Sequence, residues 1–253
     1  MNIGICKLCD QARELQRSHV IGRSVFRNML KPGEHYTYTA SLAEKRIVRS
    51  NDQWATPMLC SECEQLLNNK YENYSLWALK NKQHGVKHRI SNDHLVISNL
   101  NQYRVGMYIL SIFWRASQSE HRIFANIEIT EEINNYLKSC IYGNSILDSN
   151  AVKFKIAKLK CSRNYYTTEH LSGIIINPIL RKINDNSFSY FMIFSGYYFE
   201  ITFFCSLVFK CREEGVLKRN KRILRVPFID LLSIPEIRNG LIKTKKIHES
   251  QIN

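Results

Sequence analysis

The sequence lacks any run of eighteen or more apolar residues, so we expect no segment to span a bilayer. Its most apolar stretch, residues 188–209, is interrupted by polar and glycine positions and is rich in aromatic and β-branched residues, which favours a pair of strands. The N-terminus lacks a basic region followed by an apolar one, so no secretory signal is predicted. We therefore expect a cytoplasmic protein without a membrane partner.

Recognisable catalytic motifs are missing from residues 100–253. We find no glycine pattern that would cradle a phosphate, no Walker lysine and no nucleophile elbow. Trp114-Arg115 could contact nucleic acid at the end of a predicted helix, although a core position is the favoured interpretation of Trp114. Any catalytic chemistry is therefore expected near the N-terminus.

Acidic residues are scarce beside basic ones. The chain has 22 Asp and Glu against 36 Lys and Arg, a formal net charge of +14. Such an excess favours association with phosphate backbones, and nucleic acid, preferably DNA, is the expected partner. The alternative is a solvated surface in a chain that is simply rich in lysine.

Eight cysteines in a chain without a secretory signal indicate metal ligands and buried thiols rather than disulfides. Four of them form two Cys-x-x-Cys pairs: Cys6 with Cys9, and Cys60 with Cys63. Four thiolates suit one tetrahedral zinc ion in a closed site, which stabilises the fold and leaves no position for a substrate. The alternative is four ordinary buried cysteines.

The segment Ser18-His19-Val20-Ile21 lies between the two pairs, and a helix is predicted to follow Cys63. Over about residues 6–75 this arrangement resembles the zinc-stapled form of the HNH (ββα-metal) endonucleases. The resemblance implies a treble-clef fold and metal-assisted hydrolysis of phosphodiester bonds, with His19 as the base that activates water and Mg²⁺ or Mn²⁺ as catalytic ion. It also implies a host-defence or mobile-element effector, working beside a separate sensing or ATPase subunit.

The chain departs from the family pattern at the metal ligands. Ser18 stands where the family has Asp or His, and Glu64 where it has His or Asn. A carboxylate suits hard cations, so Glu64 is a candidate ligand, joined by Glu72 or Asp52. Glu72 lies about 80° round an ideal helix from Glu64. The alternative is a non-catalytic zinc module that binds nucleic acid or a protein partner.

Two groups of basic residues are candidate phosphate contacts. The first flanks His19 and comprises Arg17, Arg23 and Arg27, whose guanidinium groups can make bidentate contacts. The second is the run containing Lys218, Arg219, Lys221 and Arg222. For both groups, ordinary solvated surface charge is the alternative.

Hydrophobic periodicity predicts an α+β protein. We expect a zinc-stapled treble-clef domain over residues 1–80, a basic linker over 81–100, and a helix plus antiparallel-sheet domain over 101–253 that binds nucleic acid or a partner. The expected helices cover residues 24–30, 61–80, 102–119 and 131–140, and a hairpin or loop covers 35–49. The expected strands cover residues 151–159, 174–176, 188–194 and 198–209.

Overall fold

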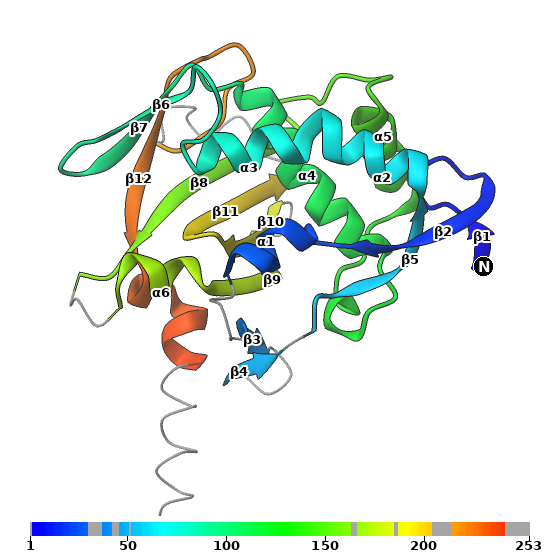
Figure 1. Cartoon of the computed structure of the whole chain (residues 1–253), viewed down its shortest axis with the longest axis horizontal. Helices are drawn as coiled ribbons and strands as arrows, with labels where there is room; N and C mark the ends of the chain where they lie inside the picture. The colour runs from blue at the N-terminus through cyan, green and yellow to red at the C-terminus, as the bar shows by residue number, and fades with distance from the viewer. Residues whose placement is uncertain are drawn as a thin grey trace, which may run out of the picture.

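The structure is a computed structural model, and it describes residues 2–29, 37–41, 46–50, 52–162, 166–184, 187–203 and 214–240. It combines helices with a three-stranded and a nine-stranded sheet, which confirms the α+β class (Figure 1). Cys205, Cys211 and the end of the strand expected at 198–209 lie outside the described residues. None of the helices described is both long and apolar enough to cross a membrane.

The small sheet brings the two cysteine pairs together. Its strands are β1 (Ile3–Ile5), β2 (Ala12–His19) and β5 (Ala55–Cys60), in the order β1-β2-β5, and both pairings are antiparallel. The turn between β1 and β2 carries the first pair, and β5 ends at the second. Helix α1 (Arg23–Met29) follows β2 and confirms the short helix expected there.

One helical segment follows Cys60 and includes a π turn. It consists of α2 (Ser61–Leu67), a π-helical turn (Asn68–Glu72) and α3 (Asn73–Leu79). A π turn is wider than an α turn and winds less per residue. Relative to an ideal helix, Glu72 is therefore rotated towards the face that carries Glu64, which the sequence could not indicate.

The large sheet is mostly antiparallel, with strand order β4-β3-β9-β10-β11-β8-β12-β7-β6. Only two of its pairings are parallel, β3 with β9 and β12 with β8. Its strands are β3 (Thr37–Ser41), β4 (Arg46–Ser50), β6 (Lys87–Ile90), β7 (His94–Ser98), β8 (Val152–Lys160), β9 (Ile174–Asn184), β10 (Ser187–Phe194), β11 (Tyr197–Phe203) and β12 (Leu224–Asp230).

Residues 81–100, for which the sequence predicts a linker, contain β6 and β7. These strands extend the large sheet beyond β12, with Leu224 opposite Ile97 in the register. Of these two strands, β7 has the buried apolar residues, Leu95, Val96 and Ile97. Strand β6 is mostly exposed and basic, so its sequence does not show the pattern of a half-buried strand. The proposed boundaries at residues 80 and 100 stay predictions, and the N- and C-terminal parts share one continuous hydrophobic core.

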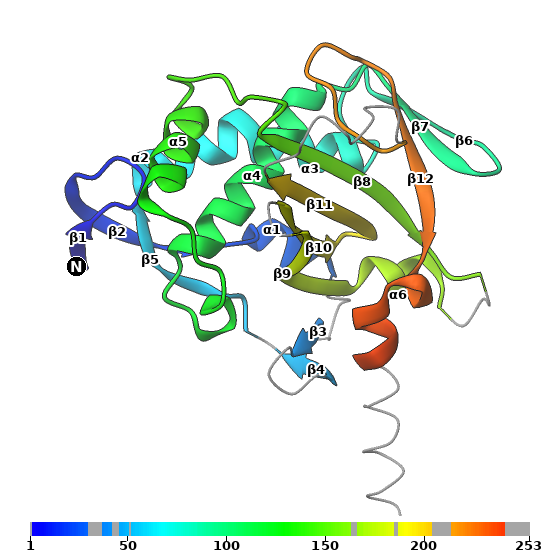
Figure 2. The ribbon, with the colours of Figure 1, turned by 180° about the vertical axis from the view of Figure 1, so that it is seen from behind.

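Helices cover both faces of the large sheet (Figures 1 and 2). Helix α4 (Gln102–Gln118) is buried along most of its length, and the ring of Phe113 lies 4.7 Å from Tyr190 and 4.9 Å from Phe203 between ring centroids. Helix α5 (Glu131–Tyr142) packs beside it, and the Thr130 side chain caps its N-terminus. A smaller core lies under α6 (Thr168–Ser172), the 3₁₀ turn Leu231–Ser233 and a helical segment at 235–240.

Candidate functional site

The four predicted zinc ligands form one cluster. The Sγ atoms of Cys6, Cys9, Cys60 and Cys63 all lie within 4.8 Å of one another, and those of Cys9 and Cys60 are 3.9 Å apart. A tetrahedral site with Zn–S bonds of about 2.3 Å has sulfur separations of about 3.8 Å. The four cysteines can therefore hold a metal ion such as zinc.

The surroundings of the sulfurs favour the thiolate form of Cys6 and disfavour that of Cys63. Burial alone would raise the pKa of Cys6, but backbone N–H groups of Cys9 and Cys60 lower it to about 7; the Cys60 N–H lies 3.3 Å from the Cys6 sulfur. Burial and the neighbouring cysteines raise the pKa of Cys63. A divalent cation among the sulfurs would offset the cost of ionising Cys63, because it stabilises all four thiolates at once.

His19 stands at the end of β2, half-buried, opposite Ala55 on β5. Its Nε2 lies 3.2 Å from Oε1 of Gln53. With Nε2–H donating to that amide oxygen, the lone pair of the neutral ring is on Nδ1. Burial lowers the pKa of His19, and the charge of Arg23 lowers it further. The Gln53 hydrogen bond and the charge of Glu64 raise it, but the net shift is downward. A neutral imidazole at pH 7 with a fixed tautomer can accept a proton.

Glu64 lies in the first turn of α2, directly after the last cysteine, and its charge acts on His19. Its Oε1 is buried and has no hydrogen-bond partner among the described residues. Burying a carboxylate oxygen without a hydrogen-bond donor costs free energy, unless a group that is not part of the protein binds that oxygen. A divalent cation with oxygen preference fits that position.

A buried arginine, Arg115 of α4, connects His19 to Glu72. Its Nη1 donates to the His19 backbone oxygen at 2.8 Å, and its Nη2 lies 3.4 Å from Oε2 of Glu72. Ser24 also donates to Glu72, at 3.5 Å. A Cβ on Gly22 would lie 1.8 Å from Oε1 of Glu72, so this position has to be glycine for the carboxylate to approach. Glu72 is thus engaged with Arg115 and holds the end of β2 against α4.

Breaking the buried Arg115–Glu72 ion pair should lower the free energy of unfolding far more than breaking an exposed ion pair. We expect Arg115→Met to lower the free energy of unfolding by about 3–5 kcal/mol, because Glu72 is left buried without its cation. Arg13→Met removes the exposed pair with Glu62 and should cost about 0–1 kcal/mol. Urea unfolding of both variants measures the difference. Equal costs would show that Arg115 does not support the site.

The carboxylate of Asp52, a candidate metal ligand, is bonded to His121 and to the Trp54 backbone. Its Oδ2 lies 2.8 Å from Nε2 of His121, and its Oδ1 accepts from the Trp54 backbone N–H at 2.8 Å. Burial opposes ionisation of Asp52, but the Trp54 N–H and His121 lower its pKa. The Asp52–His121 pair holds the segment that carries Gln53, and thereby helps to position Gln53 against His19.

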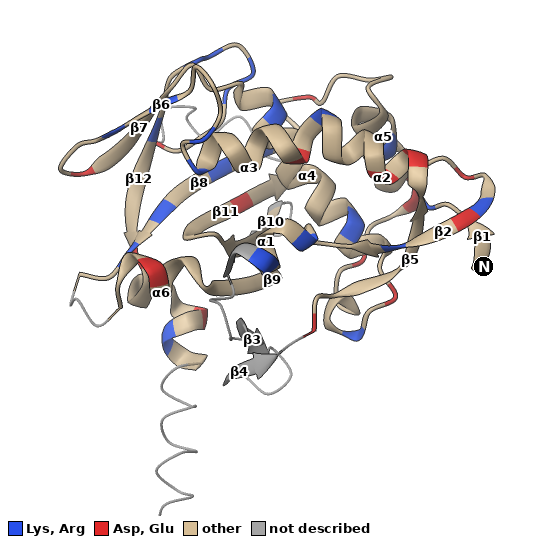
Figure 3. Ribbon diagram, viewed as in Figure 1, with Lys and Arg blue, Asp and Glu red and all other residues tan. Residues whose placement is uncertain are grey.

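The three arginines expected beside His19 are exposed. Arg17 lies on β2, and Arg23 and Arg27 lie on α1. Figure 3 shows basic positions gathering where β2, α1 and the end of α4 come together. Of the three, Arg23 is the one whose charge acts on His19. Their exposure leaves them available to an anionic ligand.

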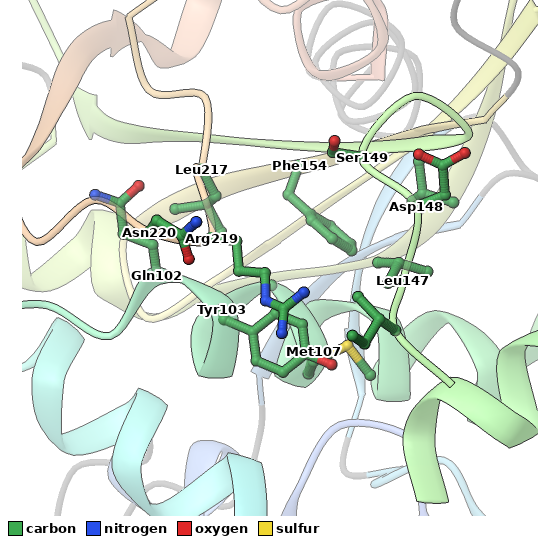
Figure 4. Close-up of a pocket in the computed structure, with 13 residues that line it drawn as sticks. Gln102, Tyr103, Met107, Leu147, Asp148, Ser149, Phe154, Leu217, Arg219 and Asn220 are labelled. Carbon is green, nitrogen blue, oxygen red and sulfur yellow. The ribbon is translucent and has the colours of Figure 1, made fainter. Parts of the chain in front are cut away.

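The second basic run belongs to a loop attached to the start of α4. The Lys218 backbone N–H donates to Gln102 at 2.8 Å, and the Arg222 carbonyl accepts from Leu100 at 2.9 Å. The four basic side chains are exposed. Arg219 lies over the ring of Tyr103, 5.3 Å from its centroid, at the mouth of a cavity of about 380 Å³ (Figure 4). Figures 1 and 2 place this loop above the helices and α1 below them.

Sequence reasoning missed two members of the site. Gln53 carries no motif that marks it as a partner of a histidine. Arg115 was expected as a nucleic-acid contact at a helix end, but it is buried and bonded to His19 and Glu72. The apolar residues directly before Arg115, Ile112 to Trp114, are the signal that could have indicated burial. Trp114 is a core residue whose Nε1–H donates to Asn134 at 2.8 Å.

No protein-family model, curated protein or solved structure matches this chain.

Proposed function

We propose that this chain is a divalent-metal-dependent endonuclease that hydrolyses phosphodiester bonds of DNA, with a zinc-stapled, HNH-like treble-clef unit at its N-terminus. One observation carries the proposal: the charge of Glu64, whose buried Oε1 has no hydrogen-bond partner among the described residues, acts on a neutral His19 oriented by Gln53, and Glu64 directly follows the last cysteine of the cluster. A general base and a carboxylate that can bind a divalent ion are the components that metal-assisted hydrolysis requires.

His19 is the general base of this proposal. Gln53 holds Nε2, so Nδ1 is left as the proton acceptor and would take a proton from the attacking water. The lowered pKa keeps the imidazole neutral at pH 7. Arg115 fixes the backbone at His19 through its carbonyl oxygen, and therefore acts as a positioning residue.

Glu64 is the proposed ligand for Mg²⁺ or Mn²⁺. The bound ion would supply charge stabilisation at the phosphate and the leaving oxygen. Glu72 has its carboxylate at Arg115 and Ser24, so we assign it to positioning rather than to coordination. The four cysteines hold zinc for stability, since a closed four-sulfur site offers no position to a substrate.

The substrate proposal rests on charge. Arg17, Arg23 and Arg27 flank His19 in the sequence and are exposed on β2 and α1, and the chain carries a net charge of +14. Arginines suit phosphates because their guanidinium groups bind two oxygens at once. The role in host defence and the separate sensing or ATPase subunit follow from the HNH resemblance alone.

Cleavage of supercoiled plasmid tests the proposal. We expect nicking with Mg²⁺ or Mn²⁺, and none with EDTA at a concentration that leaves the zinc bound. Glu64→Gln should lower the rate by about 100-fold, because it removes the charged metal ligand. Glu62→Gln, an exposed glutamate on the same turn, should cleave at the wild-type rate. Equal rates for the two variants would remove Glu64 from the mechanism.

A non-catalytic zinc module is the second candidate, and Ser18 favours it. Ser18 occupies a position where the family has a metal ligand, yet its Oγ accepts from the Leu59 N–H at 3.0 Å and donates to the Gln16 carbonyl at 3.3 Å. It is therefore a structural residue. Plasmid that stays intact in every metal, together with salt-sensitive DNA binding, would favour the module over the enzyme.

A further inference from the structure

A cationic pocket forms at the edge of the large sheet, separate from the cysteine cluster. It lies where the end of α3, the β6–β7 hairpin, β8 and the β10–β11 turn meet, and its volume is about 590 Å³. Its polar lining includes Lys80, Lys82, His88 and Lys158, and none of the described residues that line it is acidic. Figure 3 shows basic positions on β8, the strand that carries Lys158.

The positive charges in this pocket act on one another without a carboxylate between them. Burial lowers the pKa of Lys158 to about 8. Burial and the charge of Lys82 lower the pKa of Lys80. Burial lowers the pKa of His88 as well, and the charge of Lys158 lowers it further. Gathering cations in a partly buried place costs stability, and a bound anion would offset that cost.

The ammonium group of Lys158 is held in position. It lies 3.9 Å from the centroid of the Tyr197 ring, and the Tyr197 hydroxyl donates to the Leu79 carbonyl at 2.8 Å. The ring is thereby fixed between β11 and the end of α3. Gly196 keeps the approach to the ammonium open, because a Cβ there would lie 3.1 Å from Nζ of Lys158. Gly196 also has a φ of +73°, which suits glycine.

We propose that this pocket binds a small molecule with clustered phosphate groups, such as a nucleoside diphosphate or triphosphate. Three lysines require more negative charge than one carboxylate supplies, whereas a diphosphate carries several negative charges in one compact group. Leu79, Leu95 and Tyr197 give the pocket apolar walls for the rest of such a molecule. The volume lies within the range of about 300–1,000 Å³ found for small-ligand sites.

The phosphates could also come from nucleic acid, and the test separates the two sources. Calorimetric titrations in a phosphate-free buffer would use inorganic pyrophosphate, ADP and a ten-residue oligothymidylate. The proteins are the full-length wild type, Lys158→Met and, as matched control, Lys160→Met, which removes an exposed lysine from the end of the same strand. Lys80→Met is a second pocket variant for the case that Lys158→Met does not fold.

We expect the wild type and Lys160→Met to bind pyrophosphate and ADP equally well. Lys158→Met, or Lys80→Met in its place, should bind both at least tenfold more weakly. Absence of saturable binding by the wild type would overturn the proposal, and so would equal affinity in the pocket variants. It would also be overturned if these variants lost affinity for the oligothymidylate while keeping it for pyrophosphate and ADP, since the pocket would then serve nucleic acid.

Discussion

His19→Ala should lower the rate of metal-dependent plasmid cleavage by about 10²–10⁴-fold, the range that a general base contributes. The zinc content should stay at the wild-type value, because His19 is not among the four sulfur ligands. His19 is half-buried and its ring is hydrogen-bonded to Gln53, so the free energy of unfolding should change by about 1 kcal/mol. Loss of chemistry and retention of fold are therefore separable in this variant.

The pH dependence of cleavage identifies the base. Burial lowers the pKa of His19, so the ring stays neutral until the pH falls below the ordinary imidazole value of about 6.5. The acid limb of the rate profile should therefore have its midpoint below that value and be absent in His19→Ala. Added imidazole should restore part of the rate of His19→Ala, whereas a purely structural role would give no such rescue. His84→Ala, at an exposed position, should behave as wild type.

Cys60→Ser should release the zinc and unfold the N-terminal unit. Structural zinc sites contribute apparent free energies of about 10–16 kcal/mol in small zinc domains, which is comparable with the whole stability of a protein. Cys60 is buried at the junction of β5 and α2, and its N–H also donates to the sulfur of Cys6. Loss of one ligand therefore disturbs the sheet, the helix and the cluster together.

Zinc stoichiometry and thermal unfolding measure this effect. Cys161→Ala removes a buried thiol from outside the cluster and should cost about 1 kcal/mol with no loss of zinc. A Cys60→Ser protein that keeps one zinc per chain and unfolds at the wild-type temperature would show that the cluster does not hold the ion. Cleavage should be lost in Cys60→Ser even with Mn²⁺ present, because β5 also positions the strand that ends at His19.

The four-cysteine cluster could be predicted from the sequence because the signal is local. Each Cys-x-x-Cys pair is one tight turn, and two such turns in a short segment suggest one ion. The helices at 61–80, 102–119 and 131–140 were predictable for a similar reason, since their apolar residues recur at helical spacing. Alternating burial on β8 also follows directly from Val152, Phe154 and Ile156.

The remaining features depend on contacts between distant segments. Arg115 and Glu72 are 43 residues apart, and neither has a local pattern that indicates the other. The π turn shifts the helical register at Glu72, although the apolar stripe around it is compatible with an ordinary helix. Strand β12 pairs with both β7 and β8, and the pocket at Lys158 is assembled from residues of α3, β6, β7, β8, α6 and β11. Periodicity reports which face of an element is buried, but not which element covers it.

Anomalous X-ray scattering from crystals soaked in Mn²⁺ is the most direct test of a zinc-stapled hydrolytic site. Data collected above the zinc edge should give a peak at the centre of Cys6, Cys9, Cys60 and Cys63, and data above the manganese edge a separate peak at the Glu64 carboxylate on the side of His19. Manganese absent from Glu64, or zinc absent from the four sulfurs, would contradict the proposed division between a structural and a catalytic ion.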